Sequence, residues 1–169
     1  MISDSKNVPD LKAIINTAGK LLLKKKNSIA VAESVTSGNI QAIFSMAQNA
    51  IRFFQGGITA YNLGQKSRHL HVEPTDAIEY NCVSKKVAEQ MAIRVSELFS
   101  ADYGIGITGY ASPVPEQNIA KLFAFISIAK NKKSLLTKRV AAKTMAPEDV
   151  QLFYTKESIK LLISALKSQ

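Results

Sequence analysis

The stretch AVAESVTSGNIQAIF, residues Ala30 to Phe44, decides how this sequence is interpreted. An apolar run stops at a cluster of hydroxyl residues and a glycine, and apolar residues then return at helical spacing in Ile40, Ile43 and Phe44. Serine, threonine and glycine are common at turns and helix starts, so the pattern predicts a buried strand that turns directly into a helix. The turn is either an ordinary helix cap or a reactive, ligand-binding turn whose unpaired backbone N–H groups attract an anion.

Helical and strand patterns continue on both sides of this turn. Helical spacing of apolar residues occurs at 11–22, 37–46, 84–100 and from 147 to the C-terminus, and a short helical turn carries Lys66 and Leu70. Strand patterns occur at 28–34, 56–61, 103–108, 122–129 and 135–142. Ala88 and Ala92 permit close packing of the helix at 84–100. A hairpin turn across residues 131–133 makes the predicted sheet mixed. We therefore predict an α/β fold, a single three-layer α/β/α domain over residues 1–169 with a mixed sheet of about five strands.

Composition excludes several classes of protein. A chain of 169 residues with 46% hydrophobic content predicts one domain with an ordinary core. No apolar run approaches the ~20 residues that span a bilayer, and the N-terminus lacks a secretory pattern, so we expect a cytoplasmic protein with no membrane partner. One cysteine, Cys82, and two histidines, His69 and His71, make no credible metal site.

The net charge of +9 suggests an anionic partner, but the cations are scattered. Short lysine-rich runs at 24–26 and 130–133 lie where predicted elements end, where they complement a helix dipole or keep a hairpin tip soluble. Aromatic residues are not interleaved with them, as binding of single-stranded nucleic acid requires. We therefore expect no nucleic-acid partner.

Further motifs follow the opening turn in a fixed order. Gly57-Ile58-Thr59-Ala60-Tyr61 precedes Lys66, Val83-Ser84 opens the long helix, and the strand after Ala101-Asp102 ends in Thr108-Gly109. In this order and spacing, from about Leu11 to Leu166, the sequence resembles the CinA C-terminal domain family, the nicotinamide-nucleotide amidohydrolases. The strongest element, Glu33-Ser34-Val35-Thr36-Ser37-Gly38, resembles the family's E-S-x-T-G-G signature.

The resemblance implies a Ser/Lys amidohydrolase that converts nicotinamide mononucleotide to nicotinate mononucleotide and ammonia without a metal or cofactor. It places the nucleophile at Ser34 and the general base at Lys66, and it implies a small-molecule nucleotide as partner and a possible homo-oligomer. The residue types fit, since a serine hydroxyl needs a neighbouring base and a lysine serves as one when its pKa is lowered. We expect Ser34 at the C-terminal end of a strand and Lys66 within hydrogen-bond reach of it. The implied substrate-binding residues are Glu33, Thr36, Ser37, Gly38, Tyr61, Thr108 and Gly109.

The sequence departs from the family pattern at three places. Ser37 replaces the first glycine of T-G-G. The loop 109–120 keeps Gly109, Ala111 and Pro113 but lacks the family's glycine pair and lysine, and Thr144-Met145-Ala146-Pro147 stands where an arginine is usual. The Ser34/Lys66 pair remains, whereas features that would bind the substrate are eroded. Two interpretations follow: a working amidohydrolase, or a catalytically degenerate CinA-like domain that acts as a nucleotide-binding or protein-interaction module.

Overall fold

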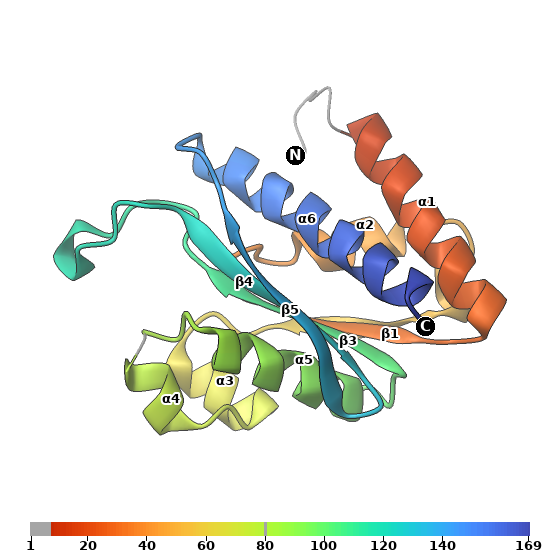
Figure 1. The fold of residues 1–169 in the computed structure, drawn as a ribbon, viewed down its shortest axis with the longest axis horizontal. Helices are drawn as coiled ribbons and strands as arrows, with labels where there is room; N and C mark the ends of the chain where they lie inside the picture. Colours follow the sequence, from red (N-terminus) through yellow and green to blue (C-terminus); the bar gives the residue numbers. More distant parts are fainter. Residues whose placement is uncertain (1–7, 80) are drawn as a thin grey trace.

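The computed structural model describes residues 8–79 and 81–169 and contains a five-stranded sheet (Figure 1). The strands lie in the order β2 (Phe54–Thr59), β1 (Ile29–Glu33), β3 (Tyr103–Gly109), β4 (Phe123–Lys130) and β5 (Lys133–Ala141). β1 runs parallel to both of its neighbours, whereas β4 is antiparallel to β3 and to β5. The predicted mixed sheet is confirmed.

Helices cover both faces of this sheet (Figure 1). One face carries α1 (Val8–Lys25), α2 (Asn39–Ser45) and α6 (Pro147–Lys167), and the other carries α3 (Leu63–Leu70), α4 (Pro74–Glu79) and α5 (Lys85–Leu98). Two single 3-10 turns, η1 (Ala50–Arg52) and η2 (Pro115–Gln117), complete the described elements. The three layers are as predicted. Within the described residues, no helix has the length and apolarity needed to cross a membrane.

Side-chain alternation along β1 decides what each residue of the opening stretch contacts. Ile29 and Val31 belong to the core under α1, α2 and α6, whereas Ala30 and Ala32 belong to the core under α3 and α5. Successive side chains of a strand point to opposite faces. The alternation therefore directs Glu33 toward α2. It directs Ser34, the residue after the strand, toward α3.

Small residues allow α5 to lie directly on the sheet. A Cβ atom added at Gly104 would lie 1.9 Å from the carbonyl oxygen of Ala92, and one added at Gly106 would lie 2.3 Å from that of Ala88. Both alanines are fully buried. The predicted close packing of this helix is confirmed, and it uses glycine on the strand as well as alanine on the helix.

Element boundaries differ from the predictions where the backbone turns. The helix expected from Ser37 begins at Asn39, because Ser37 and Gly38 have φ values of 49° and 97°, which no right-handed helix accommodates. The hairpin turn is confined to Asn131 and Lys132, and both have positive φ, as a two-residue turn of this kind requires. Helix α4 was not predicted, because its six residues are too few to establish a helical period.

Candidate active site

Three parallel strands end at the same edge of the sheet and bring the predicted site residues together. Ser34 follows β1, Tyr61 comes two residues after β2, and Thr108 and Gly109 end β3. Ligands of open α/β sheets bind at the carboxyl ends of the strands. The expected position of Ser34, in the turn between a strand of the sheet interior and the next helix, is confirmed.

The Ser34 hydroxyl and the Lys66 amine form a hydrogen-bonded pair. Lys66 Nζ lies 2.8 Å from Ser34 Oγ, 2.9 Å from the Ala60 carbonyl oxygen and 3.1 Å from the Tyr61 carbonyl oxygen. The two side chains belong to residues that are only 1% (Lys66) and 7% (Ser34) exposed. The expected distance is confirmed, and no loop movement is needed to bring the pair together.

Helix α3 holds Lys66 in this position. The side-chain oxygen of Asn62 accepts a hydrogen bond from the Gln65 N–H, which fixes the first turn of the helix. Lys66 and Leu70, one helical turn apart, are both buried against the sheet. Leu70 anchors the helix in the core, so the amine one turn earlier is directed at the end of β1.

Burial changes the acid–base character of the lysine. Desolvation lowers the pKa of Lys66 from its usual 10.5 to about 8, and the nearby Cys82 thiol opposes this shift. A neutral amine can donate its two N–H groups to the two carbonyl oxygens and direct its lone pair at the Ser34 hydroxyl. The contacts of Lys66 thus match those of a general base near neutral pH.

The carboxylate of Glu33 organises the turn that carries Ser34. It accepts hydrogen bonds from the backbone N–H groups of Gly38, Ile40 and Gln41, at 3.0, 3.1 and 2.8 Å, and the residue is fully buried. We expected Glu33 to bind substrate; its carboxylate instead binds the start of α2. Gly38 likewise gives its N–H to this carboxylate and not to a ligand.

A cavity of about 360 Å³ opens beside the pair. It is lined by Ser34, Val35, Tyr61, Asn62, Leu63, Lys66, Asn81, Cys82, Val83, Thr108, Gly109, Tyr110, Ala111, Ser112, Val114 and Gln151. Of the predicted substrate-binding residues, Tyr61, Thr108 and Gly109 line the cavity, and Glu33, Thr36, Ser37 and Gly38 do not. Thr108 donates its hydroxyl to the Cys82 carbonyl oxygen at 2.7 Å, so it connects β3 to the segment before α5.

Several lining residues were not predicted as site residues. Asn62 could have been found, because an asparagine three residues before Gln65 is a typical helix start. Asn81 and Cys82 lie in a turn where both have positive φ, and nothing in their sequence neighbourhood indicates that the turn faces Lys66. Gln151 comes from α6, far along the chain, so only the folded topology places it at the cavity.

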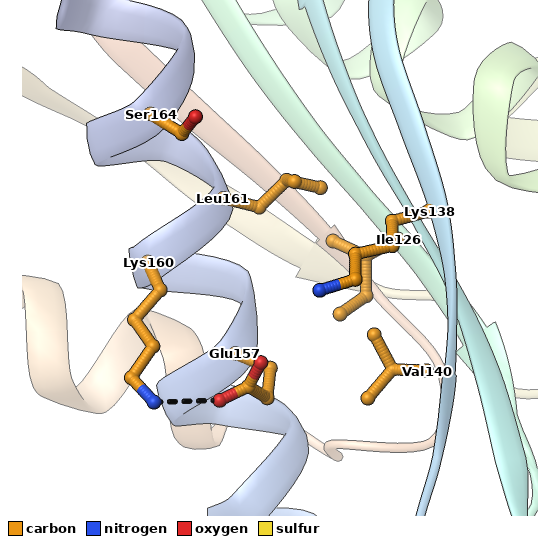
Figure 2. A pocket seen from close by; sticks show the side chains of 7 residues that line it. All are labelled: Ile126, Lys138, Val140, Glu157, Lys160, Leu161 and Ser164. Carbon is orange, nitrogen blue, oxygen red and sulfur yellow. Dashed lines mark hydrogen bonds and ion pairs between the residues drawn. The ribbon is translucent and has the colours of Figure 1, made fainter.

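A second hollow lies on the α6 side of β4 and β5 and has a different character (Figure 2). It measures about 210 Å³ and is lined by three aliphatic side chains, Ile126, Val140 and Leu161, and by four polar or charged ones, Lys138, Glu157, Lys160 and Ser164. Its Lys160 ammonium is paired with the Glu157 carboxylate at 2.8 Å (Figure 2). Because this hollow pairs no hydroxyl with a base, we assign no reaction to it.

Comparison with known proteins identifies the family. The family model described as the CinA C-terminal domain matches residues 11–166. The chain belongs to the CinA C-terminal domain family. A CinA-like protein of Picosynechococcus is 38% identical over 111 residues, which make up 66% of this chain and 26% of that protein. A putative competence-damage inducible protein of Streptococcus agalactiae is 35% identical over 120 residues, 71% of this chain and 29% of that protein. The chain thus spans about a quarter of the length of these relatives.

Solved structures of the CinA superfamily share the fold. A superfamily protein of Klebsiella pneumoniae matches with a TM-score of 0.88 at 21% identity, covering 94% of this chain and 99% of that one. One from Escherichia coli matches with a TM-score of 0.85 at 22% identity, covering 97% and 95%. At this identity the likeness establishes the three-layer architecture with its mixed five-stranded sheet.

Proposed function

We propose that this CinA-family domain is a Ser/Lys amidohydrolase that releases ammonia from the carboxamide of nicotinamide mononucleotide and yields nicotinate mononucleotide. One observation carries the proposal: the Lys66 amine lies 2.8 Å from the Ser34 hydroxyl, and both are buried at the edge of a cavity. A buried amine of lowered pKa is the kind of base that activates a serine.

The chemistry proceeds in two steps. Neutral Lys66 accepts the Ser34 proton while Oγ attacks the carboxamide carbon, and the protonated amine returns the proton to the departing nitrogen, which leaves as ammonia. The resulting ester on Ser34 is then hydrolysed by water, from which Lys66 takes a proton and returns it to Oγ. Both steps need the lysine neutral at the start, so burial of the amine serves catalysis directly.

Backbone N–H groups beside Ser34 are the available oxyanion donors. The Ser37 N–H donates to the Ser34 carbonyl oxygen at 3.2 Å, and the Gly38 N–H donates to Glu33. Among the described residues, neither the N–H of Val35, which lines the cavity, nor that of Thr36, which does not, has such an acceptor. An unpaired N–H group of a cavity-lining residue next to a nucleophile is suited to an oxyanion hole, so Val35 is the first candidate donor.

Ammonia release from nicotinamide mononucleotide tests the proposal. Ser34→Ala should abolish release, since it removes the nucleophile. Lys66→Met should lower kcat by about 10³-fold or more, because the hydroxyl loses its base while the buried stem keeps its bulk. Matched controls are Ser45→Ala, on the exposed side of α2, and Lys85→Met, whose side chain is 69% exposed; both should retain wild-type turnover.

A binding module is the second candidate, favoured by the eroded loop 109–120. In that case the wild-type protein releases no ammonia, yet nicotinamide mononucleotide raises its melting temperature, because a ligand that binds only the native state stabilises it. Measuring ammonia and melting temperature on the same sample separates the two functions.

A further inference from the structure

We propose that the cavity binds the nicotinamide and ribose of its substrate and makes no ionic contact with a 5′-phosphate, so that nicotinamide riboside and the mononucleotide are equivalent substrates. The inference rests on the proposed function and concerns the substrate class of the same cavity. It stands on the charge of the lining residues and on the internal hydrogen bonds of the helix α2 start beside them.

The cavity offers no cation that is free to bind a phosphate. Among the described residues that line it, Lys66 alone is charged. The Lys66 amine is already within 3.1 Å of three protein oxygens, those of Ser34, Ala60 and Tyr61, and it must be neutral to act as a base. A phosphate that leaves water needs charged partners to compensate its lost hydration. The described lining supplies no charged partner for a phosphate.

The start of helix α2, where an anion would be expected, is already occupied. Glu33 accepts the N–H groups of Gly38, Ile40 and Gln41, so a carboxylate of the protein itself fills the position that a phosphate takes at a helix N-terminus. The carboxylate is fully buried, and its negative charge repels a second anion.

In the loop after β3, the N–H groups of Ala111 and Ser112 line the cavity without a backbone acceptor, and most of the others are paired within the protein. The N–H of Tyr110 donates to the Phe123 carbonyl oxygen, and those of Val114 and Ile119 are paired with each other's carbonyl oxygens in an isolated β-bridge. Residues 113 and 115 are prolines and have no N–H. This loop (residues 110–119) therefore offers a phosphate two neutral N–H donors and no cation, which is less than the longer array of free N–H groups that cradles a phosphate.

The starts of helices α6 and α3 add little to the binding of a phosphate. The first turn of α6 carries Glu148 and Asp149, which compensate the helix dipole with protein charge. In the first turn of α3 the Gln65 N–H donates to the Asn62 side chain, and the cation of that turn, Lys66, is already paired with three protein oxygens. At an exposed site, a helix start alone changes the affinity for an anion by about two- to fivefold.

The aromatic residues of the cavity suit the nicotinamide ring, at the opposite end of the substrate from the phosphate. Tyr61 and Tyr110 present aromatic rings, and aromatic faces attract cationic rings such as a nicotinamide nucleoside's pyridinium. A bound pyridinium also favours the neutral form of Lys66, since a like charge nearby disfavours protonation. Recognition through the cationic ring is common to the riboside and the mononucleotide.

The test compares both compounds with the wild-type protein at about 0.15 M salt, where surface charges are largely screened. We expect kcat/KM for ammonia release from nicotinamide riboside and from the mononucleotide to agree within tenfold. A tenfold or larger preference for the mononucleotide overturns the inference and leaves the proposed function standing.

Binding to the Ser34→Ala variant provides a readout that does not depend on catalysis. Calorimetric Kd values for the two compounds should agree within tenfold, and 10 mM ribose 5-phosphate should not compete. If neither compound releases ammonia with the wild-type protein, the proposed function fails and these Kd values decide the inference alone. Tenfold tighter binding of the mononucleotide, competition by ribose 5-phosphate, or binding of neither compound overturns it.

Discussion

The proposed reaction depends on one buried amine, that of Lys66. Its contacts use every position around Nζ: two carbonyl oxygens and the Ser34 hydroxyl. The same burial that lowers the pKa of this amine also costs folding free energy, because a charged lysine must lose its hydration to enter this position. Activity and stability should therefore respond to the same ionisation.

The pH dependence of activity follows from the lowered pKa. Because the pKa of Lys66 is about 8, roughly a tenth of the free protein has a neutral base at pH 7. kcat/KM should rise about tenfold per pH unit below 7 and level off above pH 8 to 9. Initial rates of ammonia release between pH 6 and 10 measure this, and a rate that falls with rising pH would contradict the assignment of Lys66 as base.

The same ionisation predicts how stability changes with pH. The folded-state pKa lies below the unfolded value of 10.5, so between about pH 8 and 10.5 the unfolded chain binds one proton more than the folded chain. The free energy of unfolding of the wild type should therefore increase relative to that of Lys66→Met, by about 2.5 kcal/mol from pH 7 to pH 10. Urea titrations of both proteins at the two pH values measure the difference. A constant difference would mean that Lys66 titrates as it does in water.

Ser37 occupies a backbone conformation that favours glycine, in the turn after Ser34. Its φ of 49° lies in the left-handed region, and its hydroxyl makes only a 3.5 Å contact with the Ser34 carbonyl oxygen. Ser37→Gly should be more stable than Ser37→Ala by about 1 kcal/mol, because only glycine adopts this φ without strain. Thermal unfolding compares the two variants. Equal stability would show that the turn relaxes around a Cβ atom.

At the scale of elements, the contact between β3 and α5 is the one whose packing leaves the least room for a larger side chain. A Cβ atom at Gly106 would lie 2.3 Å from the Ala88 carbonyl oxygen and 2.4 Å from the Ala92 nitrogen, and backbone atoms cannot move aside without shifting the helix. Gly106→Ala should lower the free energy of unfolding by about 3 kcal/mol. The control is Gly64→Ala in the first turn of α3, where a Cβ atom would meet only the Asn62 side chain at 3.5 Å; it should be neutral or stabilising by up to about 1 kcal/mol. Chemical denaturation that ranks the two variants in the opposite order would refute this account of the packing.

Elements were predictable where a single periodicity ran long enough. The patterns of β3 and α5 indicated both elements from local sequence, and the motif order brought Ser34 and Lys66 to one site. The predicted start of α2, at Ser37, lies two residues before the observed one. The reason is that Glu33, at the end of β1, accepts hydrogen bonds from the start of α2, and the chain between β1 and α2 makes a left-handed turn at Ser37 and Gly38. That arrangement depends on tertiary geometry, which residue spacing does not contain. The same holds for Gln151, which reaches the cavity only through the placement of α6 on the sheet.

At the scale of the whole molecule, the net charge and the site charge are separate properties. The chain carries a net charge of +9, yet among the residues that line the cavity Lys66 alone is charged. The surplus cations therefore act on a ligand from a distance, through a field that salt screens. A mononucleotide is attracted by this field through its phosphate, whereas a cationic riboside is repelled.

Salt should therefore alter the relative use of the two compounds. At about 10 mM ionic strength, where the screening length is about 30 Å, kcat/KM should favour the mononucleotide, and at about 0.5 M this preference should shrink toward parity. The change should appear mainly in KM, because the field acts on encounter and binding and leaves the Ser34/Lys66 chemistry unchanged. Steady-state kinetics of both compounds in a sodium chloride series provide the measurement. A preference for the mononucleotide that persists undiminished at 0.5 M salt would require a short-range partner for the phosphate, and the lining of this cavity would then be an incomplete account of the site.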